Sequence, residues 1–351
     1  MMESTSFEVS TTDRFVVVVR VNTHCDLGCL YCGYSKDVHR QRRSISVKSL
    51  LRFGEVLREL QQVSGRKVLV SLLGGEPFQW PALIPVATQL VQIDLSLSVT
   101  TNGLALENDQ TARFAMDYMD EITISIDGLG ADHDRLRGSR GMVERLERIV
   151  RRIVSHRIDA NRSPDRGAIR GGIKPLIRVN TVLTRHTIAD FERFAQRMAD
   201  WGVDELTFNQ LGGNDRPEFY PDNHLLEDQV HQFTEMFPRV RQELRERGLE
   251  LSGSQSYLHR IACTARHQTI AIEDCFPATR FLFIDETGHA SPCSFTSDCL
   301  GVPIDQITNA TAIEALASTW QQQRRNHRPH VCKDCHATHV HSKFSLPVLT
   351  R

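Results

Sequence analysis

Three cysteines near the start of the chain have the spacing of a metal-binding loop. Cys25, Cys29 and Cys32 fall within the stretch THCDLGCLYCGY, and no fourth cysteine lies nearby. Thiolates held this closely select zinc or an iron–sulfur cluster. A [4Fe–4S] cube takes four ligands, so three thiolates would leave one iron open to a small chelating molecule. The loop therefore predicts a catalytic cluster; a zinc site or three unrelated buried thiols are the alternatives.

The elements around this loop follow a repeating order of strand and helix. Short β-branched runs, each closed by polar residues or glycine, predict buried strands, and segments with apolar residues three and four apart predict helices between them. The strands are expected over 14–22, 67–75, 96–103, 121–128, 176–184 and 205–213, and the helices over 46–63, 141–154, 187–202 and 225–248. This alternation predicts parallel strands in an α/β sheet or barrel. The ligand site then lies at the carboxyl ends of the strands, directly beside the cysteine loop.

Composition excludes several classes of protein. The 351 residues carry 42 Lys and Arg against 43 Asp and Glu, a net charge of −1 that argues against a dedicated nucleic-acid binder. The longest apolar runs, such as FVVVV, fall far short of the roughly 20 residues of a membrane span. The N-terminal stretch MMESTSFEVSTTDRF has no features of a secretion signal. We therefore expect a cytoplasmic protein whose nine cysteines bind metal rather than form disulfides.

The cysteine spacing C-x3-C-x2-C, with an aromatic residue before the last cysteine, resembles the signature of the radical S-adenosylmethionine (SAM) superfamily. The stretch LLGGEPF at the end of the second strand is similar to that family's GGE motif. The resemblance implies that Gly74, Gly75 and Glu76 receive the ammonium group of SAM. Glycines permit close backbone approach, and the Glu76 carboxylate has the opposite charge.

Three further stretches, TTNG (100–103), SIDG (125–128) and RVNTVLT (178–184), resemble the later strand ends of the same family. The resemblance implies a partial (β/α)6 TIM-like barrel in which Ser125, Asp127 and Asn180 reach the ribose or the methionine part of SAM. By the same analogy Arg178 would meet the SAM carboxylate, and backbone groups at Tyr34 would contact adenine. The stretch HDRLRG (133–138) resembles members with a C-terminal cluster-binding extension of the SPASM or twitch type.

The C-terminal cysteines fit such an extension. FLFIDETGHAS predicts a hairpin with its turn at 286–288, flanked by cysteines, and CKDC adds a chelating pair after a helical segment over 310–325. The pattern C-x12-G-x4-C, then C-x2-C, resembles the start of the SPASM/twitch signature, but no further C-x5-C-x3-C run follows. The resemblance implies one auxiliary [4Fe–4S] cluster, with zinc as the alternative. Its ligands would be Cys275, Cys293, Cys332 and Cys335.

The remaining cysteines and the late histidines carry weaker signals. Cys263 and Cys299 are expected to be small buried hydrophobic residues, although Cys299 is also close enough in sequence to Cys293 to act as a hydrogen donor or spare ligand. Five histidines near the end of the chain are expected at the surface, with one tuning the cluster through a hydrogen bond. They are His327, His330, His336, His339 and His341.

The resemblance also predicts the division of the chain: an N-terminal tail over 1–14, a radical SAM core over 15–250 and a twitch/SPASM-like α+β domain over 251–345. The loop HRIDANRSPDRGAIRGG (156–172) interrupts the core and is expected to be a solvated insertion, with a substrate-binding flap as the alternative.

The chemistry that the resemblance implies is cleavage of SAM to methionine and a 5′-deoxyadenosyl radical, which abstracts a hydrogen atom from the substrate. An electron donor of the flavodoxin or ferredoxin type would supply the first cluster. The auxiliary cluster would take an electron from the substrate radical, so the expected enzyme is an oxidoreductase that oxidises its substrate or forms a bond.

Two substrate classes remain open for an enzyme. A third hypothesis is that the protein is not an enzyme. A small polar metabolite is favoured, because the barrel begins near Arg14 and leaves no room before it for a peptide-recognition domain. The alternative is maturation of a ribosomally made precursor peptide by cross-linking or epimerisation. A non-enzymatic iron–sulfur or zinc-binding adaptor is the remote reading. No nucleic acid or membrane partner is expected.

Overall fold

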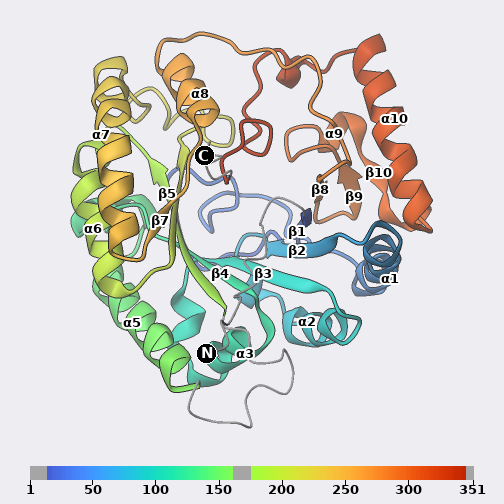
Figure 1. Ribbon diagram of the computed structural model, residues 1–351, viewed down its shortest axis with the longest axis horizontal. Helices are drawn as coiled ribbons and strands as arrows, with labels where there is room; N and C mark the ends of the chain where they lie inside the picture. The colour runs from blue at the N-terminus through green and yellow to red at the C-terminus, as the bar shows by residue number, and fades with distance from the viewer. Residues whose placement is uncertain (1–13, 161–174, 345–351) are drawn as a thin grey trace, which may run out of the picture.

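A computed structural model of the chain describes residues 14–160 and 175–344, and one ten-stranded sheet forms its centre (Figure 1). The strand order is β10-β9-β8-β1-β2-β3-β4-β5-β6-β7. The strands are β1 (Arg14–Arg20), β2 (Lys67–Leu73), β3 (Ser96–Thr101), β4 (Glu121–Ser125), β5 (Leu176–Leu183), β6 (Glu205–Gln210), β7 (Glu250–Leu251), β8 (Phe281–Ile284), β9 (His289–Ser291) and β10 (Val302–Pro303). From β8 through β1 to β7 every neighbouring pair is parallel, whereas β8–β9 and β9–β10 are antiparallel.

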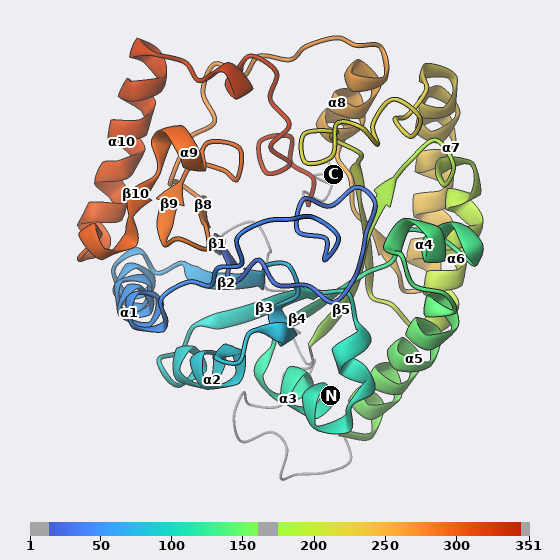
Figure 2. The same ribbon diagram turned by 180° about the vertical axis from the view of Figure 1, so that it is seen from behind.

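Helices connect the parallel strands and cover the outer face of the sheet, as Figures 1 and 2 show from opposite sides. They are α1 (Val47–Ser64), α2 (Leu83–Gln92), α3 (Asp109–Tyr118), α4 (Ala131–Arg137), α5 (Met142–Ala160), α6 (Phe191–Trp201), α7 (Glu227–Glu246), α8 (Gln255–Ala265), α9 (Ser297–Leu300) and α10 (Ala310–Asn326). The six predicted strands are β1 to β6, and the predicted partial (β/α)6 TIM-like barrel is confirmed. Helices α2, α3, α4, α8 and α9 were not predicted.

Alternating burial along the strands separates the two faces of the sheet. In β1 the side chains of Phe15, Val17 and Val19 are buried, and their neighbours along the strand are half-buried. The same alternation runs through β5, where Arg178 and Asn180 share the half-buried face. Helices cover one face, so the other face lines the interior of the barrel. The polar residues of β5 therefore belong to the interior, where a ligand would bind.

The C-terminal part of the chain extends the same sheet. The predicted hairpin is present as β8 and β9, and β8 pairs in parallel with β1, with Val16 opposite Phe281. The sheet is thus continuous across the boundary predicted at residue 250, and the division into two domains stays a prediction. The segment that follows α10 returns into the concavity of the sheet (Figure 1).

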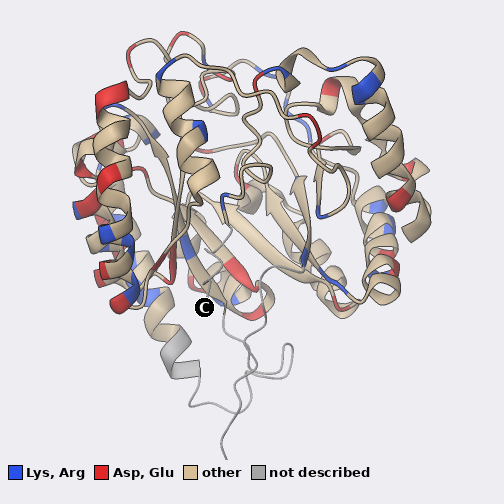
Figure 3. Ribbon diagram, turned by 45° about the horizontal axis from the view of Figure 1, so that its top comes forward, with Lys and Arg blue, Asp and Glu red and all other residues tan. Residues whose placement is uncertain are grey.

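The distribution of charged residues and the hydropathy of the helices agree with what the composition predicts. Figure 3 shows the positions of acidic and basic residues mixed along the outer helices. Among the described residues, no helix is long and apolar enough to cross a membrane. The predicted tail, except Arg14, and most of the predicted insertion (156–172) lie outside the described residues.

Candidate active site

The first cysteine loop leaves β1 at the barrel mouth and folds tightly on itself. Cys29 is buried, Cys25 and Cys32 are half-buried, and the Cys32 N–H donates to the Cys29 carbonyl. Burial raises the pKa of Cys25 to about 12 and that of Cys29 to about 11, and the charges of neighbouring thiols add to both shifts. Thiolates in this place need a positive partner, and a bound metal centre would supply one.

Gly74 and Gly75 hold this loop against the end of β2. A Cβ atom on Gly74 would lie 2.5 Å from the Oδ1 atom of Asn22, and one on Gly75 would lie 2.1 Å from the carbonyl oxygen of His24. Two backbone hydrogen bonds fix the contact, from Gly75 N to Asn22 O and from Glu76 N to His24 O. The glycines are therefore required by the approach of the cysteine loop itself. Their predicted contact with SAM stays a prediction.

Glu76 braces the ends of β2 and β3. Its side chain is 1% exposed, and its carboxylate accepts hydrogen bonds from the Thr101 hydroxyl (2.8 Å), Asn102 N–H (2.7 Å) and Phe78 N–H (3.1 Å). Burial raises the pKa of Glu76 to about 7, and these donors oppose the shift. Since Oε2 accepts one of these bonds and Oε1 two, Oε2 keeps acceptor capacity for the predicted SAM ammonium. The Asn102 side chain also donates to Asp26, which follows Cys25.

Asp127 has a structural role that was not predicted. Its carboxylate is fully buried and accepts hydrogen bonds from Arg137 through Nε (2.6 Å) and Nη2 (3.0 Å), from the Tyr31 hydroxyl (2.6 Å) and from Val182 N–H (2.9 Å). Four donors thus occupy its acceptor positions, and its predicted contact with the ribose or the methionine part of SAM stays a prediction. The Arg137 guanidinium holds the pKa of Asp127 below its usual range against the effect of burial.

Arg137 thereby links the cysteine loop to the helix that follows β4. It is the fifth residue of the stretch HDRLRG, and its guanidinium lies 5.6 Å from the ring centroid of Tyr31, which stands between Cys29 and Cys32. The Leu30 N–H donates to the Leu136 carbonyl, and Gly138, with φ of 66°, packs against the backbone of Gly28. A positive φ and a backbone contact explain a glycine at this position. The stretch supports the cysteine loop, a role that the sequence analysis did not assign to it.

We expect Arg137→Met to destabilise the fold by about 3–5 kcal/mol, because it leaves the Asp127 carboxylate buried without its cation. Arg135→Met is the matched control on the same helix: Arg135 pairs with Asp132 at the surface, where an ion pair contributes about 0–1 kcal/mol. Urea unfolding of the two variants and the parent measures the difference. Equal midpoints for the two variants would contradict the assigned role of Arg137.

Tyr34 and Ser125 lie near the mouth as predicted, but the backbone of Tyr34 is engaged. The Tyr34 ring lies between the guanidinium groups of Arg20 and Arg40, at 4.7 and 4.6 Å. Its N–H donates to the sulfur of Cys32, and its carbonyl accepts from Arg42. The predicted adenine contact by these backbone groups stays a prediction. Ser125 is half-buried at the end of β4, and its predicted contact with SAM stays a prediction.

Arg178 lies away from the mouth, toward the amino ends of the strands. It forms ion pairs with Glu121 (2.9 Å) and Glu205 (2.6 Å), the first residues of β4 and β6, and Glu121 also pairs with Arg14, the first residue of β1. Two carboxylates neutralise its charge, so its predicted contact with the SAM carboxylate is not supported. The position of Arg178 in the sequence of β5 did not reveal that this residue lies at the rim opposite the barrel mouth.

Asn180 remains among the residues of the interior. It stands opposite Ser125 in the pairing of β4 with β5, level with the end of β4. Its Oδ1 atom accepts hydrogen bonds from Thr207 (2.9 Å) and Lys343 (2.8 Å). The structure thus brings Asn180 to the predicted level of the barrel, and its contact with SAM stays a prediction.

The four predicted auxiliary ligands come together. Cys275, Cys293, Cys332 and Cys335 line one cavity between the β8–β9 hairpin region and the segment after α10. Burial raises the pKa of Cys275 to about 11, and the charges of the other three thiols add to the shift. The Cys335 N–H donates to the Ile270 carbonyl at 2.8 Å, which fixes the chelating pair against the chain before β8.

Neither cysteine set forms a preformed site for a single ion: no group of three or more His, Cys, Asp or Glu side chains within residues 14–160 and 175–344 is arranged to hold one. The fit of each set to a cluster rests on its donor chemistry, which is sulfur throughout, and on the convergence of the thiols in one loop or one cavity.

Some of the remaining cysteines and histidines have the burial that the sequence predicts, and others do not. Cys263 is buried as expected, but Cys299 is exposed, with its sulfur 3.6 Å from the Thr296 carbonyl. His327 and His330 are exposed and His336 and His339 are half-buried, whereas the surface position predicted for His341 is wrong. His341 is 3% exposed, and His339 stacks on Phe281 with 4.1 Å between ring centroids. His336 and His339 line the cavity of the auxiliary cysteines.

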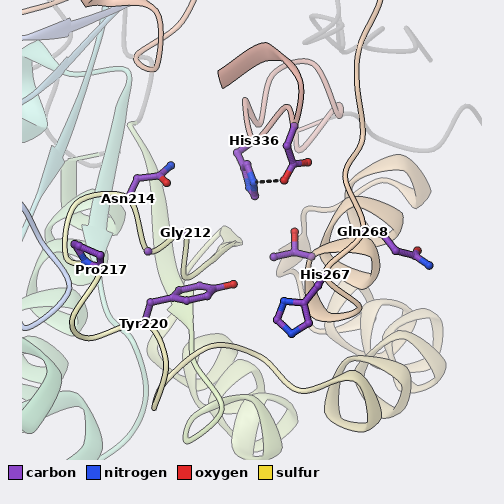
Figure 4. Close-up of a pocket in the computed structure, with 10 residues that line it drawn as sticks. Gly212, Asn214, Pro217, Tyr220, His267, Gln268 and His336 are labelled. Atoms are coloured by element: carbon purple, nitrogen blue, oxygen red, sulfur yellow. Dashed lines mark hydrogen bonds and ion pairs between the residues drawn. The ribbon is translucent and has the colours of Figure 1, made fainter. Parts of the chain in front are cut away.

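A second cavity, of about 400 Å³, lies beside the auxiliary cavity, with which it shares His336 (Figure 4). The loop after β6 contributes Gly212, Asn214 and Tyr220, the end of α8 contributes His267, and the segment after α10 contributes His336. In Figure 4 these side chains come from separate elements and surround the opening, with His336 hydrogen-bonded to Asp334. The same loop carries Asp215, whose Cβ lies 3.2 Å from where a Cβ on Gly33 would stand, beside Cys32. The cavity therefore shares His336 with the auxiliary cavity, and the loop that lines its other side also approaches the first cysteine loop.

Comparison with known proteins agrees with the first site. Residues 19–165 match the model of the Radical SAM superfamily, and this stretch is a radical SAM domain. Such a domain takes a [4Fe–4S] cluster and SAM as cofactors. The PqqA peptide cyclase of Ruegeria pomeroyi is 22% identical over 57% of this chain and 48% of its own, and the mycofactocin maturase MftC of Mycobacterium tuberculosis is 22% identical over 77% and 62%. Pre-heme d1 synthase of Dinoroseobacter shibae is 28% identical over 38% and 32%. The chain thus spans less than two thirds of the length of each of these relatives.

Solved structures share the fold. SuiB of Streptococcus suis bound to S-adenosylmethionine superposes with a TM-score of 0.62 at 16% identity, over 92% of this chain and 72% of that one. The native anSMEcpe structure with bound AdoMet gives 0.60 at 16% identity, over 87% and 82%. At these identities the likeness shows the fold alone, and it includes the C-terminal part of this chain.

Proposed function

We propose that the protein is a radical SAM oxidoreductase that matures a peptide. The observation that carries the proposal is the three-cysteine loop, which lies at the barrel mouth and is held there by Gly74, Gly75 and the Arg137 network within a radical SAM domain. A cluster on Cys25, Cys29 and Cys32 would supply the electron that cleaves SAM and so starts hydrogen abstraction from the substrate.

The residues of the chain orient the reactants and exclude water from them. The backbone of 22–24 is fixed to β2, so the three thiols keep one position relative to the barrel axis. Glu76 offers a partly filled carboxylate to the SAM ammonium, and Asn180 offers an amide at the level of the β4 end. Fixed groups of this kind favour one bound geometry and lower the cost of reaching the reactive one.

The auxiliary site supports an oxidative outcome. Four thiols on one cavity suit a second [4Fe–4S] cluster held by Cys275, Cys293, Cys332 and Cys335, which would accept an electron from the substrate. The cavity of about 400 Å³ beside the auxiliary cavity is the proposed place of the substrate. Its size falls within the range of about 300–1,000 Å³ that is usual for ligand pockets. A flavodoxin or ferredoxin would deliver the first electron.

Peptide maturation replaces the small metabolite as the favoured substrate class. The PqqA peptide cyclase and the mycofactocin maturase are named for such reactions, and SuiB has been solved bound to its precursor peptide SuiA. The cavity also suits a peptide: its lining mixes polar side chains with glycine, proline and tyrosine, and the charge of Asp334 is neutralised inside the protein by Arg260. A neutral polar lining matches peptide groups better than a strongly charged metabolite. The similarity to pre-heme d1 synthase supports the second candidate function, a reaction with a small-molecule product.

The test uses the full chain, reconstituted anaerobically and supplied with SAM and a reductant. We expect formation of 5′-deoxyadenosine, and transfer of deuterium into it from a deuterated short peptide encoded beside this chain's gene. Absence of 5′-deoxyadenosine from protein with full iron content would refute the radical SAM proposal. Transfer from deuterated metabolite pools, with none from the peptide, would show that the substrate class is wrong and the chemistry right.

A further inference from the structure

A basic segment follows the first cysteine loop directly. Residues 36–43, KDVHRQRR, carry four Lys or Arg and one Asp, although the chain as a whole has a net charge of −1. The segment belongs to the connection between β1 and α1, which crosses the side of the molecule that faces the viewer in Figure 2. Three of its four cations are exposed, namely Lys36, Arg40 and Arg43, and the half-buried one is Arg42. Positive charge is therefore concentrated at one exposed place beside the three thiols.

The cations of the basic segment have no acidic partner. In the part of the chain that the structure describes, no carboxylate lies within ion-pair distance of any of the four. Arg40 and Arg43 donate instead to neutral groups, the Gly33 carbonyl and the Gln41 side chain. On the outer helices, by contrast, arginines pair with carboxylates of the same or a neighbouring helix. The charge of the basic segment is thus left for an anionic partner from outside the described residues.

Arg42 ties the basic segment to both ends of the cysteine loop. Its Nη1 atom donates to the carbonyl of Thr23, before the cysteines, at 2.6 Å, and its Nη2 atom donates to that of Ser35, after them, at 3.2 Å. The Lys36 N–H donates to the Leu27 carbonyl inside the loop. The cations therefore keep a fixed position relative to the thiols. Because electron transfer slows steeply with distance, an electron donor has to approach the protein close to this loop.

The basic segment does not line the cavity proposed for the substrate. The residues around that cavity fall between 212 and 220, 264 and 268, and 334 and 336. Holding the peptide in the cavity is therefore not the task of these cations, and the balanced charge of the chain argues against nucleic acid. The electron for the first cluster, in contrast, comes from another protein, which has to dock near the thiols.

We propose that the basic segment is the docking surface for an acidic one-electron donor protein of the flavodoxin kind. The inference rests on the proposed function, because it takes a cluster on the three cysteines as the electron acceptor. In the transfer, the anionic flavin hydroquinone of the donor loses one electron and becomes the neutral semiquinone, and the cluster gains that electron. Opposite charges raise the rate at which such partners meet, and electron-transfer complexes are small and weak, so a patch of exposed cations suits the encounter.

The first test measures binding of an oxidised flavodoxin of negative net charge to the reconstituted full chain by isothermal titration calorimetry. Lys36→Gln/Arg43→Gln removes two exposed cations and keeps the backbone hydrogen bonds of both residues. This variant should raise the Kd about tenfold and make the Kd less sensitive to added salt, with unchanged iron content and circular dichroism. Lys67→Gln/Arg113→Gln removes an exposed lysine and an exposed arginine from β2 and α3; it is the matched control and should keep the parent Kd.

The second test separates docking from chemistry by changing the electron source. With reduced flavodoxin below its KM, Lys36→Gln/Arg43→Gln should form 5′-deoxyadenosine about tenfold more slowly than the parent. With reduced methyl viologen, a small cation that the basic segment does not attract, the variant should be no slower than the parent. Equal losses with both sources would show that these cations act on the cluster rather than on the donor, and would overturn the proposal.

The outcomes separate this inference from the proposed function. Equal flavodoxin Kd values for the parent and Lys36→Gln/Arg43→Gln would overturn the docking surface, while 5′-deoxyadenosine formed with methyl viologen would leave the function intact. The docking surface would also be wrong if the variant kept its affinity for flavodoxin and lost affinity for the peptide encoded beside the gene, since the basic segment would then hold substrate. Protein with full iron content that forms no 5′-deoxyadenosine from either source would refute the proposed function itself.

Discussion

Replacing Cys25, Cys29 and Cys32 together with alanine is expected to abolish SAM cleavage and to remove about half of the bound iron. The parent should hold about eight irons, the content of two cubes, and the triple variant about four. The reason is geometric: all three thiols belong to one loop at the barrel mouth, and the auxiliary thiols line a cavity of their own. The variant should fold, because the loop is anchored by backbone hydrogen bonds from Gly75 and Glu76 rather than by its sulfurs.

Iron analysis and chromatography of 5′-deoxyadenosine measure the two effects. Cys263→Ala/Cys299→Ala is the control, since it removes two cysteines that belong to neither predicted set. It should keep both the iron and the cleavage. Cleavage at the parent rate by the triple variant would show that SAM is not activated at this loop.

The fold was predictable because its signals are local. β-branched runs closed by glycine or polar residues define β1 to β6, and the burial alternation along β1 and β5 then gives each strand an outer face and an interior face. Helices α2 and α3 were missed although they lie in the same repeat. Their segments are ten residues each, so each spans fewer than about three helical turns and offers few repeats of the helical period.

The cysteine sites were predictable because ligand spacing is encoded within short stretches. Contacts across the barrel are not encoded in this way. Asp127 meets Arg137 and Tyr31, and Tyr31 lies 96 residues before it, so its saturation with donors could not be seen along the chain. Arg178 was placed correctly on β5 but at the wrong end of the interior. Three residues along a strand span roughly 10 Å, enough to separate the two rims.

Lys343 shows the same limit most clearly. It contacts Asn180 across 163 residues, and nothing in the tail sequence HSKF distinguishes it from a surface lysine. The glycines of the GGE stretch show the same limit, since the sequence did not reveal that they also face the backbone of the cysteine loop. Gly75 is needed for the backbone of His24 to approach, which is a contact within the protein.

The auxiliary site is expected to act after hydrogen abstraction. Cys332→Ala/Cys335→Ala leaves the loop of Cys25 untouched, so this variant should still bind SAM and cleave it slowly. With deuterated substrate it should still move deuterium into 5′-deoxyadenosine while forming little oxidised or cross-linked product. The substrate radical would then lack the acceptor for its electron.

This separation of steps needs a folded variant, because the loss of a cluster can unfold a small region. The alanines preserve the contacts that the structure shows around the pair: the residue 335 N–H still donates to Ile270, and Asp334 still holds Arg260 and the Ile270 N–H. Circular dichroism and a retained first cluster, about four irons, establish that the variant is intact. Cys299→Ala is the matched control, since its sulfur is exposed and lies beside the site without lining the cavity. It should form product at the parent rate. If the folded double variant did the same, the four cysteines would hold a structural metal, most simply zinc, and the electron released by the substrate would need another acceptor.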